Sequence, residues 1–280
     1  MSPTTEMLKT SKIHYFLVPM IGLLLFLVGP IHNNIPYFIN DLVTLGNRHE
    51  DLVQHCHIHE PQRQAQIFSR DPLIIYIRNF LNSVEISHLL EISEDKYEPS
   101  KVYSSFDGAL VDNKMRISES AYADVKDPVV RNITRRAREF QGWRSRSTNV
   151  EPLLVQRYKV DGFYNYHFDW DEDRKEGNRV TTFMTYLDSN CTGGGTIFPF
   201  LTQPSDDRWC DVIECEEEGR DGYQGVIFKP IAGSAIFWEN LHPNGTGHTG
   251  TYHAGLPVKS GTKVGLNIWT WDTEWIKPSE

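Results

Sequence analysis

Two histidines and one aspartate in this chain have the residue types and the order of a metal-binding set. His167 and Asp169 stand one residue apart in the run Tyr164-Asn-Tyr-His-Phe-Asp-Trp170, and His253 follows much later. A His-x-Asp pair at a strand end presents both side chains on one face, where a histidine from a neighbouring strand can complete the set. Two imidazoles and one carboxylate leave coordination positions open, which is the arrangement of oxygen-activating non-haem Fe(II) sites.

A buried cation is expected beside this set. Lys263 follows the third candidate ligand by ten positions and is surrounded in sequence by Val264, Leu266, Ile268 and Trp269. A lysine in apolar company needs an anionic partner, because an unpaired charge is costly to bury. The far carboxylate of a dicarboxylic co-substrate is such a partner, so the sequence indicates iron, 2-oxoglutarate and O2.

The composition is that of a globular chain with an attachment. Of 280 residues, 39% are apolar and 12% are aromatic, which is enough for a substantial core. The net charge is -9 and the pI is about 5.7. This charge argues against nucleic acid as a partner, because phosphate binding needs clustered Lys and Arg.

The attachment is an uncharged apolar segment at residues 15–31, whose length is at the short end of what spans a bilayer. Lys9 and Lys12 precede it, whereas Asp41 and Glu50 follow it, so the positive-inside rule predicts a cytosolic tail at residues 1–14. No good cleavage site follows, which favours a signal anchor over a cleaved signal peptide or a buried core helix. We therefore expect a single-pass type II protein of the endoplasmic-reticulum membrane with a lumenal catalytic domain.

Residues 32–68 are polar and predict a stem. The run His55-Cys-His-Ile-His59 within it resembles a metal cluster, but no partner pair stands at zinc-site spacing, so a solvated segment is the better interpretation. Cys210 and Cys215 allow a small disulfide in an oxidising compartment, which their spacing alone does not decide. Three sequons, at Asn132, Asn190 and Asn244, agree weakly with a lumenal domain.

The pattern of residues 69–280 predicts one α+β domain. A strand is expected at 73–77, followed by a helix over 83–92 with Asn82 or Ser83 as its cap, and by a second helix over 129–140. The arginines of the second helix, 131, 135, 136 and 138, are expected on its solvated face. Short strands divided by turn residues follow, at 153–155, 180–187, 196–198, 225–228, 234–238, 250–253 and 263–271. So many short strands indicate a sandwich or jelly roll, braced by the helices.

An ordered set of motifs in residues 70–275 resembles the catalytic domain of the prolyl 4-hydroxylase family of 2-oxoglutarate/Fe(II) oxygenases. The motifs are Glu151–Tyr158, Tyr164–Asp169, Arg179–Leu187, Gly193–Pro199, Phe228–Trp238, His253–Pro257, Gly261–Lys263 and Trp269. Endoplasmic-reticulum members of this family also carry a type II anchor. The resemblance implies a double-stranded β-helix.

The resemblance also implies roles for single residues. His167, Asp169 and His253 would hold Fe(II), and Lys263 would pair with the C5 carboxylate of 2-oxoglutarate. Tyr158 and Thr196 match positions that help to hold this carboxylate. Positions that line the peptide groove of the family are matched by Arg116, Ser118, Glu151, Arg179 and Trp269. The pattern departs at Trp271, where many animal and plant members have a histidine, and this puts the peptide preference in doubt.

The implied activity is hydroxylation of a C–H bond, with peptidyl-proline 4-hydroxylation of secretory-pathway polypeptides as the leading hypothesis. Succinate and CO2 would be co-products, and L-ascorbate would restore oxidised iron. A hydroxylase of a small peptide or secondary metabolite is the alternative that Trp271 and the acidic insert at 206–221 permit. A non-catalytic membrane-tethered binding module is a further alternative, which the intact ligand set disfavours. The sequence does not set the oligomeric state.

Overall fold

The computed structural model of the protein describes residues 62–101, 115–142 and 147–278, all within the unit Glu60–Glu280. The expected cytosolic tail, the apolar segment 15–31 and the His55–His59 run lie outside the described residues. Within the described ranges, no helix combines the length and the apolar character needed to cross a membrane.

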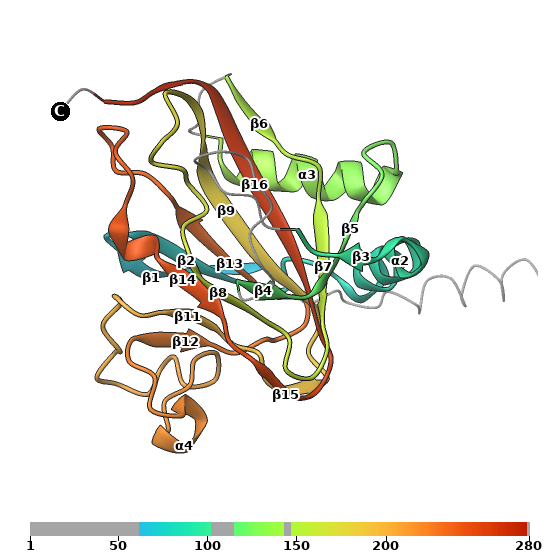
Figure 1. The fold of residues 1–280 in the computed structure, drawn as a ribbon, viewed down its shortest axis with the longest axis vertical. Helices are drawn as coiled ribbons and strands as arrows, with labels where there is room; N and C mark the ends of the chain where they lie inside the picture. The colour runs from blue at the N-terminus through green and yellow to red at the C-terminus, as the bar shows by residue number, and fades with distance from the viewer. Residues whose placement is uncertain (1–61, 102–114, 143–146, 279–280) are drawn as a thin grey trace, which may run out of the picture. The chain divides into compact units, whose positions relative to one another are not determined.

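The frame of the domain is a nine-stranded antiparallel sheet (Figure 1). Its strands lie in the order β1 (Gln64–Arg70), β2 (Leu73–Arg78), β13 (Ala235–Glu239), β9 (Glu176–Asp188), β16 (Lys263–Ile276), β7 (Leu154–Tyr158), β5 (Glu119–Tyr122) and β3 (Glu98–Pro99), while β6 (Thr148–Val150) pairs with β16. The two long central strands, β9 and β16, are paired almost from end to end.

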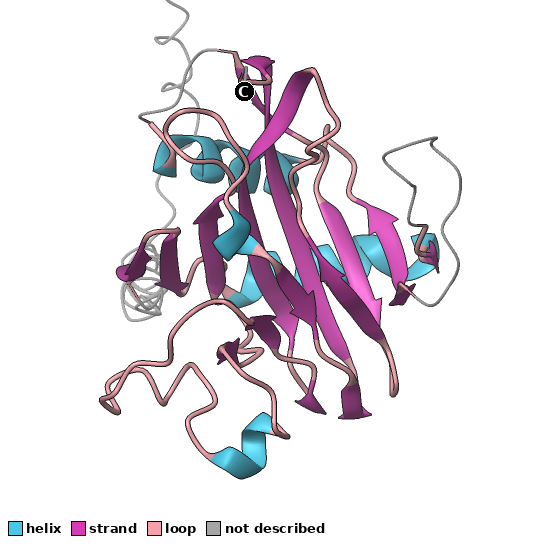
Figure 2. Ribbon diagram, turned by 60° about the vertical axis from the view of Figure 1, so that its left-hand side comes forward, coloured by secondary structure: helices cyan, strands magenta, loops and turns pink. Residues whose placement is uncertain are grey.

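A second, five-stranded sheet lies across from the large one (Figure 2). Its order is β12 (Val226–Phe228), β11 (Thr196–Phe198), β14 (His253–Gly255), β8 (Phe163–His167) and β4 (Arg116–Ile117); β10 (Cys191–Gly193) and β15 (Val258–Gly261) form a separate pair. Two facing antiparallel sheets are the architecture expected of a double-stranded β-helix.

Two helices, α2 (Ser83–Ser93) and α3 (Pro128–Phe140), cover the outer face of the large sheet (Figure 1). Asn82 caps α2 in a reciprocal box, because its side chain accepts from the Glu85 N–H and the Glu85 carboxylate accepts from the Asn82 N–H. Asp127 caps α3 in front of a proline at the first helical position. The remaining short elements are η1 (Glu94–Lys96), α4 (Glu217–Arg220) and η2 (Thr249–Thr251).

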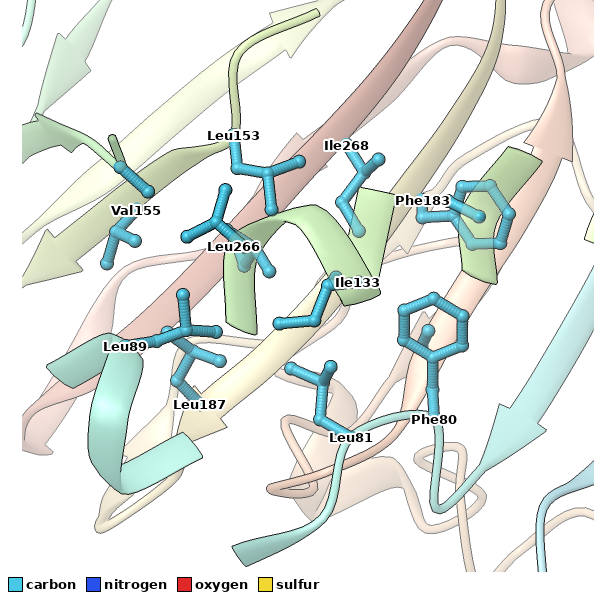
Figure 3. Close-up of a cluster of buried hydrophobic side chains, with 14 of the residues drawn as sticks. Phe80, Leu81, Leu89, Ile133, Leu153, Val155, Phe183, Leu187, Leu266 and Ile268 are labelled. Carbon is cyan, nitrogen blue, oxygen red and sulfur yellow. The ribbon is translucent and has the colours of Figure 1, made fainter. Parts of the chain in front are cut away.

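The central strands of the large sheet are buried on both faces. Phe183 and Leu187 of β9 pack beneath the helices against Ile133 of α3 (Figure 3), whereas Met184 and Tyr186 face the small sheet. Each fully buried Leu or Phe contributes roughly 1.5–3 kcal/mol to folding. A strand covered on both sides needs no polar alternation, which explains why this stretch is a continuous apolar run.

The sheet begins earlier than expected, because β1 lies partly within the expected stem of residues 32–68. Strand β1 pairs with β2 at the edge of the large sheet. Most of its side chains are exposed on both faces. Such an edge strand has no two-residue periodicity, so the sequence pattern gave no signal for it.

One arginine of α3 is not on the solvated face, contrary to expectation. Arg136 donates to the carbonyl of Phe80, at 2.7 Å, and pairs with the Glu85 carboxylate. The ion pair ties α3 to the start of α2. The periodicity of α3 alone could not predict this contact, because Glu85 comes from another helix.

A further correction concerns the strand expected at 250–253. Residues Thr249–Thr251 form the 3₁₀ turn η2, and the strand starts only at His253. The turn forms because the ring of His248 accepts a hydrogen bond from the Gly250 N–H at 3.0 Å. A side-chain cap of this kind competes with extended structure.

The acidic insert is closed by the Cys210–Cys215 disulfide that the spacing had left open, with the two Cα atoms 5.4 Å apart. Lys229, which follows β12, donates to the Cys210 carbonyl at 2.8 Å and thereby ties the insert to the small sheet. Among the described cysteines, Cys191 is free.

Candidate active site

His167, Asp169 and His253 come together between the two sheets. His167 is the last residue of β8 and His253 is the first of β14, and the antiparallel register pairs the two residues directly. One ligand atom from each of the three side chains lies within 4.8 Å of the others. We refer to these three residues as the metal cluster.

Backbone carbonyls orient both imidazoles of the metal cluster. The Nδ1 atom of His167 lies 2.7 Å from the Asn165 oxygen, and that of His253 lies 2.9 Å from the Thr251 oxygen. A carbonyl can only accept, so each Nδ1 carries the proton and each Nε2 keeps its lone pair for a metal. The ring planes are inclined at 54°, so the two lone pairs can converge on one point.

The carboxylate of Asp169 is fixed from the large sheet. Its Oδ2 accepts a hydrogen bond from the Thr182 hydroxyl at 2.7 Å, and Thr182 accepts from the Asn240 amide at 3.1 Å. The oxygen of this amide accepts from the Trp238 indole at 2.8 Å. Sequence reasoning missed Thr182 and Asn240, because the contacts that give them a role cross from strand to strand.

The protonation states suit a divalent cation. Burial, followed by the adjacent His253 ring, lowers the pKa of His167 to about 3, so this ring is neutral at pH 7. Burial opposes ionisation of Asp169, but the two facing imidazoles and the Arg179 guanidinium lower its pKa below the ordinary value. Two imidazoles and one ionised carboxylate fit Fe(II) and leave positions for other ligands.

Lys263 begins β16 and pairs in register with Tyr158, the last residue of β7. Its side chain is 2% exposed, and Nζ lies 5.2 Å and 5.5 Å from the ring centres of Tyr158 and Tyr186. Over the ranges that the structure describes, no carboxylate forms an ion pair with this ammonium. Burial lowers the pKa of Lys263 to about 8. An unpaired buried ammonium is costly, so the pocket fits a carboxylate ligand.

Hydroxyl and amide side chains lie on the strands next to this ammonium. Thr196 pairs in register with Gly255, and Gly255 lies beside the Lys263 amine. The Thr196 hydroxyl is 2.7 Å from the Tyr186 hydroxyl. The Tyr158 hydroxyl donates to Gln156, whose side-chain nitrogen has no protein partner among the described residues. The Gln156 side-chain nitrogen and one of the two hydroxyls of Tyr186 and Thr196 remain free to donate to an anion. Tyr186 and Gln156 were absent from the sequence-based prediction, because neither stands out from an ordinary strand residue.

The five expected groove residues form two groups near the metal cluster. Arg179 makes a bidentate pair with Glu151, at 2.7 and 2.9 Å, and stacks on the Trp269 ring at 3.9 Å. The Trp269 indole N–H is buried without a partner among the described residues.

The second group contains Arg116, which donates to the Ser118 hydroxyl at 2.7 Å and lies 4.6 Å over the ring of Tyr164. Tyr164 in turn stacks on His167 with ring centres 3.6 Å apart. Tyr164 therefore connects this group to the metal cluster.

Comparison with known proteins agrees with this geometry. A sequence profile described as "2OG-Fe(II) oxygenase superfamily" matches residues 153–271. The viral collagen prolyl hydroxylase of Paramecium bursaria Chlorella virus-1, solved with 2OG, is 25% identical with a TM-score of 0.52, over 71% of this chain and 95% of that one. Probable prolyl 4-hydroxylase 6 of Arabidopsis thaliana is 30% identical, over 75% of this chain and 72% of the relative. This chain belongs to the prolyl 4-hydroxylase family of 2-oxoglutarate/Fe(II) oxygenases.

As a member of this family, the protein is a 2-oxoglutarate-dependent dioxygenase that uses Fe(II). The chain covers 66% of the length of probable prolyl 4-hydroxylase 7 of Arabidopsis thaliana. It covers only 38% of the length of prolyl 4-hydroxylase subunit alpha-1 of Mus musculus, to which it is 30% identical. The expected double-stranded β-helix of the prolyl 4-hydroxylase family is confirmed for the described domain.

Trp271, the departure from the family pattern, has a defined place. Arg174 lies 5.0 Å over its ring, and Gly177 abuts it so closely that an added Cβ would come within 2.8 Å of the indole. Gly177 also has a positive φ of 68°, which favours glycine. The tryptophan is thus accommodated by residues of the neighbouring loop and strand.

Proposed function

We propose that this oxygenase hydroxylates proline residues of a polypeptide, with 2-oxoglutarate and O2 as co-substrates and succinate and CO2 as co-products. The observation that carries the proposal is the buried, unpaired Lys263 next to the metal cluster. The similarity to a viral collagen prolyl hydroxylase and to probable prolyl 4-hydroxylases supports the choice of substrate.

The residues of the metal cluster would hold Fe(II). When bound together with 2-oxoglutarate, iron supplies the oxidising power that inserts one oxygen atom into the substrate and the other into succinate. The contribution of the protein is to fix the ligands: the two carbonyls hold the imidazole rings, and Thr182 holds Asp169.

Lys263 would bind the far carboxylate of 2-oxoglutarate, with the hydroxyl of Thr196 as a further partner. Apolar and aromatic walls exclude water around the ammonium, which strengthens its attraction for an anion. The same anion would restore the ordinary charged state of the lysine, because it offsets the burial that lowers the pKa.

A peptide would cross the two groove groups. The guanidinium of Arg116 has no carboxylate partner among the described residues and can donate to peptide carbonyls. Trp269 is buried beneath Arg179 and supports its guanidinium from one side. Proline presents an apolar ring and no N–H, which suits contact with a half-buried aromatic side chain such as Tyr164.

A panel of proline-rich peptides tests the substrate. The full chain is incubated with Fe(II), 2-oxoglutarate, ascorbate and each peptide, and products are read by mass spectrometry for the gain of one oxygen on proline. The matched control is Asp169→Ala, which lacks a ligand. Succinate release without any peptide oxidation, together with oxidation of a small molecule, would instead identify the protein as a hydroxylase of secondary metabolites.

We also infer a location in the endoplasmic-reticulum lumen, with residues 15–31 as an uncleaved anchor. The charges flanking this segment, the Cys210–Cys215 disulfide and the exposed sequon at Asn244 support this location. Ascorbate, as a reductant for oxidised iron, completes the proposal. Protease treatment of intact microsomes tests the topology: digestion of the catalytic domain without detergent would contradict it.

A further inference from the structure

A second group of two histidines and one carboxylate lies near the residues that lead into the metal cluster. It consists of Asp71, in the turn between β1 and β2, with His242 and His248, in the loop between β13 and η2. One potential ligand atom from each lies within 4.8 Å of the others. We refer to these three residues as the loop cluster.

Hydrogen bonds commit the ring of His248 at both nitrogens. Its Nδ1 accepts from the Gly250 N–H at 3.0 Å, so the proton of the neutral ring is on Nε2. That Nε2–H donates to the Asp71 carboxylate at 2.7 Å. The ring of His242 stacks on His248 at 3.9 Å and 23°. Lone pairs in nearly parallel planes do not converge, so the loop cluster is built as a hydrogen-bonded brace and not as a metal site.

The brace holds the turn η2. The His248 carbonyl accepts from both the N–H and the hydroxyl of Thr251, at 3.1 and 2.7 Å. Thr251 is completely buried, and its own carbonyl is the group that fixes Nδ1 of His253. Pro72 packs on the other side of the turn, where a Cβ added to Gly250 would come within 2.8 Å of the proline ring.

We propose that Asp71 and His248 are positioning residues for His253, acting through η2. The path runs from the Asp71 carboxylate to the His248 ring, from His248 to the backbone of η2, and from the Thr251 carbonyl to the ligand. This inference rests on the proposed role of His253 in holding Fe(II). It gives the β1–β2 turn, which is remote in sequence from the site, a part in setting the geometry of the metal cluster.

The expected effect is local. Asp71 is strongly exposed, with 85% of its side chain accessible, so its pair contributes little to overall folding stability. Partners that orient a ligand directly typically change metal affinity 10–100-fold. Because His248 acts through one further residue, we expect its replacement to weaken Fe(II) binding at the lower end, by about tenfold.

Two substitutions separate the two hydrogen bonds of His248. His248→Asn keeps an acceptor near the position of Nδ1 and loses the bond to Asp71, whereas His248→Gln keeps a donor that reaches toward Asp71 and loses the cap of η2. We expect His248→Gln to weaken anaerobic Fe(II) binding about tenfold, and His248→Asn, which loses only the bond that holds the ring to Asp71, to weaken it less. At saturating iron, the 2-oxoglutarate affinity and the melting temperature of both variants should match the wild type.

Two outcomes would overturn the positioning role. These are unchanged Fe(II) affinity in His248→Gln, or a loss that appears only together with a lowered melting temperature. Stoichiometric Zn²⁺ binding to a protein in which both His167 and Asp169 are replaced by Ala, abolished by His248→Ala, would show a metal site in place of the brace. A wild-type protein that binds no Fe(II) would reject the proposed function itself, whereas normal wild-type binding with unaffected variants rejects only the positioning role.

Discussion

The metal cluster and the loop cluster have the same composition, two imidazoles and one carboxylate, but they differ in burial, ring orientation and hydrogen bonding. The side chain of Asp169 is 4% exposed and that of Asp71 is 85% exposed. The ring planes are inclined at 54° in the metal cluster and at 23° in the loop cluster. Carbonyls accept from Nδ1 in the first, whereas an N–H donates to Nδ1 of His248 in the second.

The difference shows that the hydrogen-bond partner of Nδ1 decides whether Nε2 of the same histidine can bind a metal. A carbonyl at Nδ1 leaves the lone pair of Nε2 for a metal, but a backbone N–H at Nδ1 places the proton on Nε2 and makes it a donor. The metal cluster also has a buried, unpaired ammonium nearby, at Lys263. The same residue composition is therefore suited to binding a metal in one cluster and to a hydrogen-bonded brace in the other.

The largest expected effect separates the two carboxylates. Asp169→Ala removes one of three protein ligands and should abolish 2-oxoglutarate turnover, while Asp71→Ala, in the exposed brace, should retain most activity at saturating Fe(II). Succinate release under air, with iron in excess, measures both. Loss of turnover in Asp71→Ala under these conditions, with the fold intact, would show that the loop cluster is as necessary for turnover as the metal cluster, and would contradict the distinction between them.

Removing the buried ammonium should raise the 2-oxoglutarate requirement strongly. Leaving one charge of a buried pair without its partner costs about 3–5 kcal/mol, which corresponds to roughly 10²–10⁴-fold in affinity for Lys263→Ala. Iron binding should survive. The matched control is Lys259→Ala, because that lysine is half exposed and pairs with Asp221. A Lys263→Ala enzyme with wild-type 2-oxoglutarate affinity would refute the assigned role.

Removing the Thr182 hydroxyl, which holds Asp169, should have a smaller effect on Fe(II) binding. Thr182→Val keeps the shape of the side chain but deletes the 2.7 Å hydrogen bond, and we expect about 10–100-fold weaker Fe(II) binding. Thr185→Val is the control on the same strand, since its buried hydroxyl has no partner among the described residues and its loss should be nearly neutral. Equal Fe(II) affinities in the two variants would contradict the role of Thr182.

The smallest expected effect is the pH dependence of 2-oxoglutarate binding. Burial lowers the pKa of Lys263 to about 8, so the charged form that binds the anion prevails below this pH and is lost above it. The 2-oxoglutarate dissociation constant should therefore rise as the pH passes about 8, by at most tenfold per pH unit. Lys263→Arg stays charged and should remove this dependence, whatever its absolute affinity. A flat profile in the wild type would argue against an anion contact at Lys263.

The sequence alone could predict the parts of the site that local pattern and family motif contain. The metal cluster and Lys263 could be predicted from the sequence because these residues stand at or near strand ends within recognisable motifs. Thr182, Asn240 and Tyr186 were not, since their roles depend on which strands become neighbours. The loop cluster was also unreadable, because Asp71 and His248 are far apart in the chain and meet only after β1 and β2 join the large sheet.

The fold shows the same division. Helix α2 was predictable from its apolar spacing, and its structure selects Asn82 as the cap. Strand β1 was missed because an exposed edge strand has no periodic pattern. Residues expected to form a strand form the turn η2 because His248 caps it. Arg136 is largely buried, and not on the solvated face, because it pairs with Glu85 of another helix. The miss at Arg136 is a tertiary contact that overrides a local preference, whereas the miss at η2 is a local side-chain cap.

Anaerobic titration with Fe(II) in the presence of 2-oxoglutarate tests whether His167, Asp169 and His253 hold the iron. The weak visible charge-transfer band of the iron chelate reports where iron and co-substrate meet. We expect one iron per chain and a band in the wild type and in His242→Ala, a change in the loop cluster, but no band in His253→Ala. A band that persists in His253→Ala, or iron held by the loop cluster, would contradict the assignment of the two clusters.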